Sequence, residues 1–392
     1  MENFNFDEIV DRKNTNCLKF DFSEERGMPK DILPYWVADM DFRVPEVVIS
    51  KIQECVSHGI FGYSDVKDDY SEVVINWFKK YFNYEFKKEW LIKTPSIVYA
   101  LCASVNAFTK ENDAILIQNP VYYPFTNSIL NNNRILVNNS LVYKNGKYEV
   151  DFKDFEDKIV KNNVKMFILC NPHNPVGKVF TKAELTEIGE ICLKHKVIIV
   201  VDEIHCDFTR NNNNHTIFLS IDEKFNEAAI VLTAPSKTFN IAGLQISNIF
   251  IPNSTLRENF KKEMAKTGYS QLNNIGLVAA KACYEYGDAW LNELKIYLEK
   301  NVQFLKAFLL EKLPKIKLVE PEGTYLIWLD FSELNLSDEK INELIIYEAN
   351  LWLDNGTMFG KEGEHFQRIN IACPTSFLEK GLNNLYETFK NY

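Results

Sequence analysis

The sequence lacks the features that mark several large classes of protein. Its eight cysteines are scattered with no Cys-x-x-Cys pair, and its six histidines form no ligand cluster, so we expect no metal site. No apolar stretch approaches the ~20 residues of a membrane-spanning helix. No basic tract is longer than a few residues, and the net charge is −10. This balance argues against nucleic acid or an anionic membrane as the main partner.

Export signals are missing as well. Residues 1–8 have neither the basic start nor the apolar core of a signal peptide. The scattered cysteines are typical of small buried side chains in a reducing compartment. We therefore expect a cytoplasmic protein.

The middle of the chain alternates apolar, strand-like runs with helical patterns. At 392 residues, of which 46% are apolar, the chain is long enough for two domains. One helix is expected over residues 181–195, where Thr181 and Glu184 form a capping box. The candidate strands are residues 114–118, 134–137, 165–170, 197–201, 229–233 and 248–251. This order predicts an α/β fold with a mostly parallel sheet between helices.

The pattern changes near residue 271. Residues 271–313 are helical and amphipathic, and Pro314 ends the stretch. Residues 324–330 are then typical of a strand. We expect a second, smaller domain in this part of the chain.

Lys237 has the most informative surroundings in the sequence. It follows the apolar run 230–232, in a turn of small residues. An amine held at the end of a buried strand can condense with an aldehyde to form an imine. Taken alone, such a lysine is more typical of a solvated surface charge. Two other side chains also follow strand-like runs, Asn174 within Asn171-Pro-His-Asn-Pro-Val-Gly177 and Asp202 after residues 197–201.

Together, these three side chains fit a site for pyridoxal 5′-phosphate (PLP). PLP acts as an electron sink, and the protein supplies orientation and electrostatics. A carboxylate such as Asp202 favours the protonated pyridine nitrogen, and Asn174 can donate to the phenolic oxygen. Each residue also has a plainer explanation, because Asn-Pro-x-Asn-Pro is a common turn and an aspartate can cap a helix. Their order, one β-α unit apart, favours the cofactor site.

On these residues the chain resembles the fold type I PLP enzymes of the class I/II aminotransferase superfamily. Within it, the chain is similar to the MalY/PatB subgroup of cystathionine β-lyase-like C–S lyases. The shared motifs span nearly the whole chain: Leu33-Pro-Tyr-Trp-Val-Ala-Asp-Met-Asp-Phe42, Phe61-Gly-Tyr-Ser64, Asp202-Glu-Ile-His205, Ala234-Pro-Ser-Lys-Thr-Phe-Asn-Ile-Ala-Gly-Leu-Gln245 and Arg368-Ile-Asn-Ile-Ala-Cys-Pro374.

The resemblance implies an aspartate-aminotransferase-like fold. A large PLP-binding domain, residues 46–285, would hold a mostly parallel seven-stranded sheet between helices. A smaller α+β domain would comprise residues 286–392, joined by the N-terminal segment 1–45. The resemblance also implies a homodimer, in which Tyr63 reaches the cofactor phosphate of the neighbouring subunit.

The resemblance further implies a role for each matching side chain. Lys237, Asp202 and Tyr122 are the expected catalytic residues, with Tyr122 stacked on the pyridine ring. Arg368 is expected to hold the substrate α-carboxylate, since a guanidinium matches a carboxylate with two parallel hydrogen bonds. Without the resemblance, Tyr122 would be a core aromatic and Arg368 a surface ion pair. The other expected cofactor contacts are Asn174, His205, Ser236, Ser96, Ile97 and Val98; Asn174 and Ala38 are expected to contact the substrate.

Two positions depart from the common aminotransferase pattern. His205 stands where a tyrosine is usual, and Gln245 stands where many aminotransferases have a phosphate-binding arginine. Both changes are familiar in the lyase subgroup that the chain resembles, so the resemblance favours elimination over transamination. We therefore expect a lyase that releases thiol, pyruvate and ammonia from cystathionine or a cysteine S-conjugate. Two alternatives stay open, an aminotransferase on the same scaffold and a regulatory protein that keeps PLP as a structural ligand.

Overall fold

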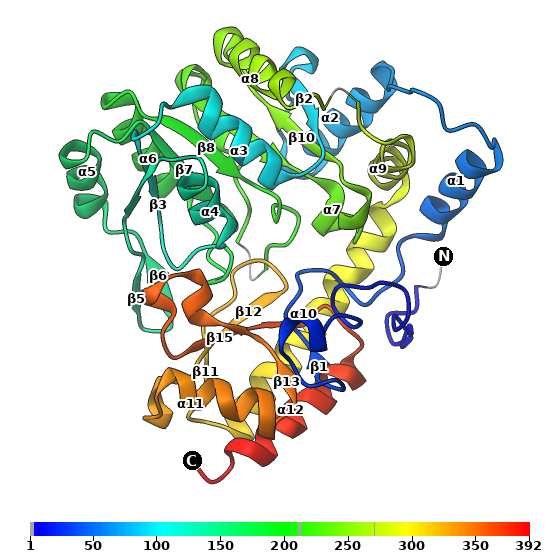
Figure 1. Ribbon diagram of the computed structural model, residues 1–392, viewed down its shortest axis with the longest axis vertical. Helices are drawn as coiled ribbons and strands as arrows, with labels where there is room; N and C mark the ends of the chain where they lie inside the picture. Colours follow the sequence, from blue (N-terminus) through cyan, green and yellow to red (C-terminus); the bar gives the residue numbers. More distant parts are fainter. Residues whose placement is uncertain (1–3, 211–212, 270) are drawn as a thin grey trace.

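A seven-stranded sheet forms the centre of the larger domain (Figure 1). The computed structural model describes residues 4–210, 213–269 and 271–392 of the chain. Strand β10 runs antiparallel to its two neighbours, and the other adjacent pairs are parallel. The mostly parallel sheet predicted from the sequence is therefore confirmed. In spatial order the strands are β2 (Leu91–Thr94), β10 (Ser247–Phe250), β9 (Ala229–Thr233), β8 (Ile198–Asp202), β7 (Met166–Cys170), β3 (Ala114–Ile117) and β4 (Ile135–Asn138).

All six predicted strands are present, with ends shifted by no more than one residue. Strand β2 was not predicted; it is a short edge strand in which Ile92 is the buried apolar side chain and Lys93 is partly exposed. The antiparallel direction of β10 was not predicted either, because apolar periodicity carries no information on strand direction. Asp202, expected just past a strand, is the last residue of β8.

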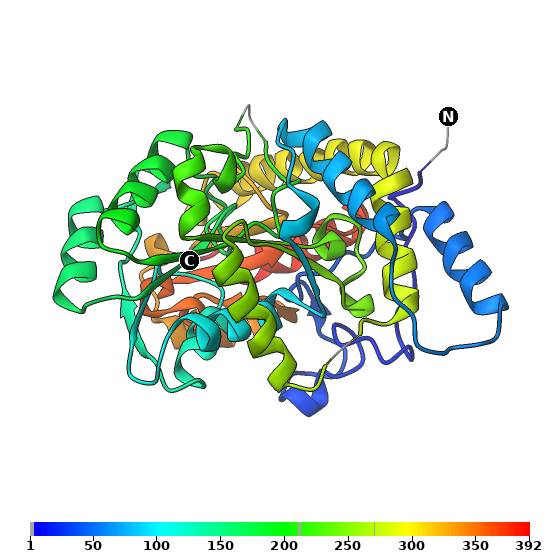
Figure 2. The same cartoon turned by 90° about the horizontal axis from the view of Figure 1, so that it is seen from above.

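Successive side chains of each central strand enter two separate cores. In β7, Met166 and Ile168 pack on one side of the sheet, and Phe167 and Leu169 pack on the other. Both faces are covered by helices, as Figure 2 shows from above, so these strands are apolar throughout. One face carries α3 (Ile97–Phe108), α4 (Pro124–Leu130) and α8 (Ser254–Lys266); the other carries α2 (Asp68–Phe82), α5 (Phe152–Lys161), α6 (Lys182–Lys194) and α9 (Asn274–Tyr286).

The capping box predicted for α6 is confirmed. The Thr181 side chain accepts a hydrogen bond from the Glu184 amide, and the Glu184 carboxylate accepts one from the Thr181 amide at 2.8 Å. The predicted helical stretch 271–313 is divided at Gly287 into α9 and α10 (Asp288–Lys312). Pro314 lies just beyond the end of α10, as expected.

The smaller domain is built on a four-stranded antiparallel sheet. Its strands, in spatial order, are β11 (Lys317–Leu318), β12 (Leu326–Asp330), β15 (Phe366–Asn370) and β14 (Asp354–Asn355). The accompanying helices are α10, α11 (Asp338–Glu343) and α12 (Thr375–Phe389). A separate hairpin, β5 (Val142–Lys144) and β6 (Lys147–Glu149), extends from the larger domain.

The N-terminal segment lies against the smaller domain (Figure 1). Its strand β1 (Leu33–Pro34) pairs in parallel with β13 (Leu351–Trp352). The following helix, α1 (Glu46–Ser57), packs on α9 of the larger domain. The packing partner of the chain thus changes near residue 45, and the division into units 1–45, 46–285 and 286–392 stays a prediction.

No helix in the described residues is long and apolar enough to cross a membrane. Within the same ranges, no group of three or more His, Cys, Asp or Glu side chains could hold a metal ion. All eight cysteines are free thiols.

Candidate active site

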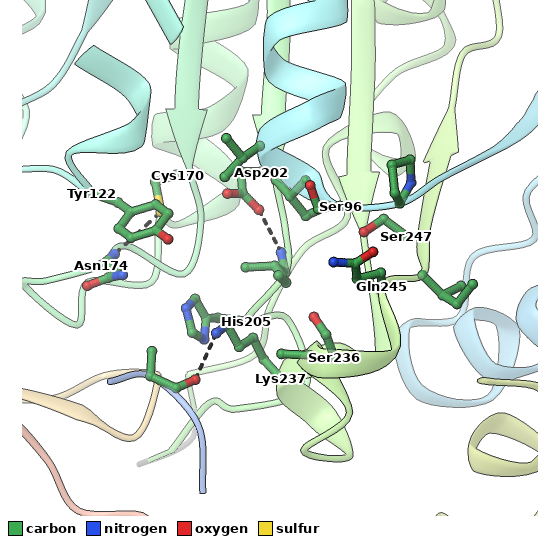
Figure 3. A pocket seen from close by; sticks show the side chains of 17 residues that line it. Ser96, Tyr122, Cys170, Asn174, Asp202, His205, Ser236, Lys237, Gln245 and Ser247 are labelled. Atoms are coloured by element: carbon green, nitrogen blue, oxygen red, sulfur yellow. Dashed lines mark hydrogen bonds between the residues drawn. The ribbon is translucent and has the colours of Figure 1, made fainter. Parts of the chain in front are cut away.

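One pocket collects nearly all of the predicted site residues at the carboxyl ends of β7, β8 and β9 (Figure 3). It holds about 730 Å³ of empty space, including the solvent at its mouth. The predicted residues that line it are Ala38, Ser96, Ile97, Val98, Tyr122, Asn174, Asp202, His205, Ser236 and Lys237. Carboxyl ends of parallel strands form the ligand crevice in open α/β sheets, and the pocket follows that rule.

Asp202 places a carboxylate deep in this pocket. Only 3% of the residue is exposed, and Oδ1 accepts a hydrogen bond from the Ile204 amide at 3.0 Å. Burial raises the pKa of Asp202 to about 7, although the Ile204 amide and the nearby Lys237 oppose the shift. A buried carboxyl of this kind is stabilised in its ionised form by any cationic group that enters the pocket.

Lys237 faces the pocket from the one-turn helix α7 (Pro235–Thr238), where the sequence analysis expected a turn. Its Nζ donates a hydrogen bond to the carbonyl oxygen of Ala38 at 2.7 Å. Burial lowers the pKa of Lys237 to about 8; the nearby Asp39 opposes this shift. A larger fraction of this amine is therefore neutral near pH 7 than for an exposed lysine.

The start of α3 presents backbone amides to the same pocket. Ser96 is the N-cap, and its hydroxyl oxygen accepts a hydrogen bond from the Tyr99 amide at 3.1 Å. This leaves the Ile97 and Val98 amides, which belong to the unpaired first turn of the helix, for a ligand. A helix N-terminus of this kind favours phosphate. In the view of Figure 3, Ser236, Gln245 and Ser247 gather on the same side as Ser96.

Tyr122 and Asn174 lie together on the opposite side in that view. The Tyr122 amide donates to the Asn174 carbonyl oxygen at 3.0 Å, which fixes the two turns relative to each other. Burial raises the pKa of the Tyr122 phenol to about 12, so its hydroxyl remains protonated near neutral pH. The Asn174 side-chain oxygen accepts a hydrogen bond from Nη1 of Arg368 at 2.9 Å, so the amide group of Asn174 is left to donate.

His205 is buried and neutral. Burial lowers the pKa of its imidazole to about 3, with Lys237 and Arg368 adding to the effect. Its Nδ1 is buried with no hydrogen-bond partner in the described residues. The side chain therefore offers the pocket an uncharged ring with an unused polar atom.

Arg368 does not line the pocket, although Asn174 connects it to the site. Only 4% of the residue is exposed, and its guanidinium stacks 5.0 Å from the Phe359 ring. Nη2 donates to the Trp36 carbonyl oxygen at 2.7 Å and also pairs with the carboxylate of Asp354. Both terminal nitrogens of the predicted substrate-binding arginine are thus paired with the protein's own groups, whereas its buried Nε has no hydrogen-bond partner in the described residues.

Tyr63 is the second predicted residue that the structure does not bring to the pocket. It is 99% exposed and lines a separate surface hollow formed by residues 61–64, 268–269 and 271–275. Tyr63 therefore does not reach the pocket of its own chain. The predicted contact with a neighbouring subunit is left as a prediction.

Several residues that line the pocket were not predicted. Ser247 enters because β10 is antiparallel, so the start of that strand lies at the carboxyl edge of the sheet. Cys170, the last residue of β7, belongs to an apolar run with no visible signal of function. Gln245, noted only as a departure from a pattern, lines the pocket in a left-handed conformation (φ 56°).

The pocket fits the predicted cofactor by its own chemistry. It offers a buried carboxylate for a pyridinium, a lysine amine for an aldehyde, and helix-terminal amides and hydroxyls for a phosphate. Lys237 is the only lysine or arginine among the described lining residues. Hydroxyls and backbone amides must therefore carry most of the contact with a phosphate.

The chain is similar to known proteins over nearly its whole length. The profile of the aminotransferase class I and II family matches residues 36–385. The chain is 40% identical to cystathionine beta-lyase PatB of Bacillus subtilis (strain 168), over 97% of this chain and 98% of that protein. The crystal structure of cystalysin from Treponema denticola, which contains PLP, has a TM-score of 0.96 at 36% identity and full coverage of both chains. The PLP-bound C–S lyase of Staphylococcus hominis with the inhibitor L-cycloserine has a TM-score of 0.93 at 34% identity, covering 99% of this chain and 98% of the other.

Proposed function

Because the chain belongs to the aminotransferase class I and II family, we propose that it is a PLP-dependent C–S lyase. The reaction is α,β-elimination on cystathionine or on a cysteine S-conjugate, giving a thiol, pyruvate and ammonia. One observation carries the proposal: the buried carboxylate of Asp202 and the amine of Lys237, with its lowered pKa, face the same pocket. The full-length similarity to a cystathionine beta-lyase and a C–S lyase supports elimination as the reaction.

Different residues of the pocket would bind the ring nitrogen and the phosphate of the cofactor. When bound, PLP supplies an aldehyde for the substrate amine and a ring that withdraws electrons from the substrate α-carbon. Asp202 would hold a proton on the ring nitrogen, because a negative charge stabilises the pyridinium. The same contact would lower the pKa of Asp202 from about 7 and keep the carboxylate ionised. The amides of Ile97 and Val98 would bind the phosphate, together with the Ser236 hydroxyl.

Lys237 is the proposed general base. When Nζ is not bonded to the cofactor and carries no charge, it can take the proton from the substrate α-carbon. The lowered pKa of about 8 increases the neutral fraction. The carbonyl oxygen of Ala38, at 2.7 Å from Nζ, gives the amine a fixed hydrogen-bond partner from which it can move to the substrate.

The substrate α-carboxylate would bind between Asn174 and Arg368. The Nη2 atom of Arg368 is already bonded to Trp36 and Asp354, whereas Nη1 makes one bond and Nε makes none in the described residues. Asn174 lines the pocket, and because its side-chain oxygen already accepts a bond from Arg368, its NH2 group is the part that can donate to the substrate. A carboxylate held by Arg368 on one side and Asn174 on the other would orient the α-hydrogen for abstraction.

Loss of the α-proton leads directly to cleavage. The electron pair of the Cα–H bond forms the Cα–Cβ double bond, the Cβ–S bond breaks, and the sulfur leaves as a thiolate that takes up a proton. The remaining aminoacrylate reacts with water to give pyruvate and ammonia. Cystathionine would release homocysteine, and cysteine would release hydrogen sulfide.

The proposal includes a cytoplasmic homodimer. Tyr63 is almost fully exposed beside two other exposed apolar side chains, Ile60 and Phe61. Clusters of this kind mark interaction surfaces, and a second subunit would cover this one. The eight free thiols suit a reducing compartment. Light scattering of wild type and of Phe61→Glu tests the assembly, since a charge in the contact would shift the protein towards the monomer.

A single assay separates the lyase from an aminotransferase on the same scaffold. The pure protein with PLP and cystathionine, and with no 2-oxo acid, should release pyruvate and homocysteine in equal amounts. Turnover that depends strictly on an added 2-oxo acid would instead establish transamination. Turnover at background level with PLP bound to Lys237 would favour a regulatory protein.

A further inference from the structure

The two segments that carry the proposed chemistry have little regular structure of their own. Asp202 ends β8, and His205 lies in the turn that follows. Lys237 lies on α7, which has four residues and no side-chain N-cap. A single helical turn is not stable in isolation. Other contacts must therefore hold Lys237 at a fixed distance from Asp202.

Asp207, at the end of the turn after β8, makes such a contact. Its Oδ2 accepts a hydrogen bond from the hydroxyl of Thr238, the residue next to Lys237, at 2.6 Å. Its Oδ1 accepts one from the indole nitrogen of Trp77 on α2 at 3.0 Å. One buried carboxylate thus connects the turn after β8, helix α7 and helix α2.

The Asp207–Thr238 bond has no substitute near the site. The last backbone hydrogen bond between β8 and β9 is the one that the Glu203 amide donates to the Leu232 carbonyl oxygen, at 2.9 Å. Beyond it, the Asp207–Thr238 pair is the only side-chain hydrogen bond between residues 203–210 and 234–244, all of which the structure describes. Past the end of the β8–β9 ladder, this pair is therefore the direct polar link between the two site segments.

The connection is stiff because it is buried. Asp207 and Thr238 are both almost fully shielded from solvent, and Phe239 packs edge-to-face on Trp77 with 5.3 Å between ring centroids. Burial raises the pKa of the Asp207 carboxyl, and the hydrogen bonds from Thr238 and Trp77 oppose this shift, so its charged form depends on both donors. Leaving either partner unsatisfied in such surroundings is costly, so the pair resists displacement.

We propose that Asp207 is a positioning residue, which fixes Lys237 relative to Asp202 by holding the Thr238 hydroxyl. This inference rests on the proposed function, because the distance matters only if both side chains act on one cofactor. It adds a residue that touches neither substrate nor cofactor.

Two substitutions at one position test the proposal. Thr238→Val removes the hydroxyl at nearly constant volume, and Thr238→Ser keeps it. Trp77→Phe is the matched control, because it removes the other donor to Asp207 but leaves the connection to Lys237. Asp207→Asn keeps the shape of the side chain and weakens the bond, and it serves if Thr238→Val does not fold.

The main readout is the pH dependence of Lys237 labelling in the full chain without cofactor. Formaldehyde and cyanoborohydride methylate neutral amines, and peptide mass spectrometry follows the modification at Lys237. In Thr238→Val the amine should lose its fixed, buried position, and its midpoint should rise by on the order of one pH unit. Thr238→Ser and Trp77→Phe should keep the labelling midpoint of the wild type. The midpoint of Asp207→Asn should lie between those of the wild type and Thr238→Val. In the enzyme with PLP, Thr238→Val should lower kcat about tenfold with little change in KM.

Two outcomes would overturn the inference: an unchanged midpoint in both Thr238→Val and Asp207→Asn, or an equal shift in Trp77→Phe, which would indicate a purely structural carboxylate. The labelling needs neither cofactor nor substrate. If the wild type proves inactive as a lyase, the proposed function fails, and the labelling midpoints still decide the role of Asp207.

Discussion

The candidate site has two halves. The cofactor half contains Asp202, His205, Lys237 and the start of α3, and the carboxylate half, which would bind the substrate carboxylate, contains Arg368 and Asn174. The halves differ in how far their polar groups already have hydrogen-bond partners. In the cofactor half, Asp202 accepts a bond from a backbone amide, His205 has an unpartnered nitrogen, and the first amides of α3 face the pocket. In the carboxylate half, Arg368 already binds Asn174, Trp36 and Asp354. The cofactor half is arranged to receive a ligand, whereas the carboxylate half must rearrange to accept one.

The origin of the two halves explains the difference. Strand ends and a helix start of one domain form the cofactor half, and their direction leaves polar groups facing outward. The carboxylate half lies where β14 and β15 of the smaller domain meet the N-terminal segment. Side chains opposite each other on these two strands can serve as each other's hydrogen-bond and charge partners. Asp354 and Arg368 are such a pair.

Removing the amine from the cofactor half should have the largest effect. Lys237→Ala should lower turnover by about 10⁴-fold or more, since it removes both the group that forms the imine and the general base. The absorbance of lysine-bound PLP should also disappear. Steady-state kinetics and visible spectra check this result, and a variant with normal turnover would exclude Lys237 from the reaction.

The uncompensated carboxylate of the cofactor half should cost the chain stability when no cofactor is present. The pKa of Asp202 in the folded chain, about 7, lies above the ordinary value of 3.8 for an aspartate. Between these values the folded state binds more protons than the unfolded state, so stability falls as pH rises from about 4 to 7. The fall can reach about 4 kcal/mol, at ~1.4 kcal/mol per pKa unit.

Asp202→Asn should abolish this decline, because an amide does not titrate. Urea unfolding of the cofactor-free chain at pH 5 and pH 7 measures the effect. The wild type and variant should differ in the pH dependence of unfolding free energy, with the variant relatively more stable at pH 7. Parallel pH profiles would mean that Asp202 is not held protonated by burial.

The carboxylate half should respond in opposite directions to two substitutions. Arg368→Ala should raise KM by roughly 30-fold or more, because it removes a charged partner of the substrate, and PLP should stay bound. Asp354→Asn should lower KM several-fold, because it removes the anion that competes for the guanidinium. Initial-rate kinetics with cystathionine compare both variants with wild type. A higher KM in Asp354→Asn would show that Asp354 orients Arg368 and does not compete with the substrate.

The smallest expected effect concerns the start of α3. Ser96→Ala removes the N-cap and should lower the unfolding free energy by about 1 kcal/mol. Because its hydroxyl oxygen already serves the Tyr99 amide, PLP affinity should fall only a few-fold. The matched change Thr181→Ala removes a similar cap far from the pocket, and it should leave PLP affinity unchanged. Equal losses of affinity in both variants would exclude a phosphate site at α3.

The sequence predicted the cofactor half far better than the carboxylate half. Asn174, Asp202 and Lys237 each follow an apolar run, and carboxyl ends of neighbouring parallel strands must meet at one edge. Ser247 could not be predicted in this way, because its strand is antiparallel and periodicity does not reveal direction. The partners of Arg368 were also hidden, since Trp36 is 332 residues away in the chain. Asp207 adjoins a recognised motif, but nothing in the sequence pointed to Thr238 as its partner.

The central claim is that one lysine amine shares a pocket with the carboxylate that supports the cofactor ring. The most direct test incubates the full chain with PLP, reduces it with borohydride and locates the pyridoxyl group by peptide mass mapping. We expect modification of Lys237 in wild type, and loss of this modification at neutral pH when Asp202 is replaced by alanine. Modification spread over surface lysines, or concentrated on a lysine other than Lys237, would contradict the account.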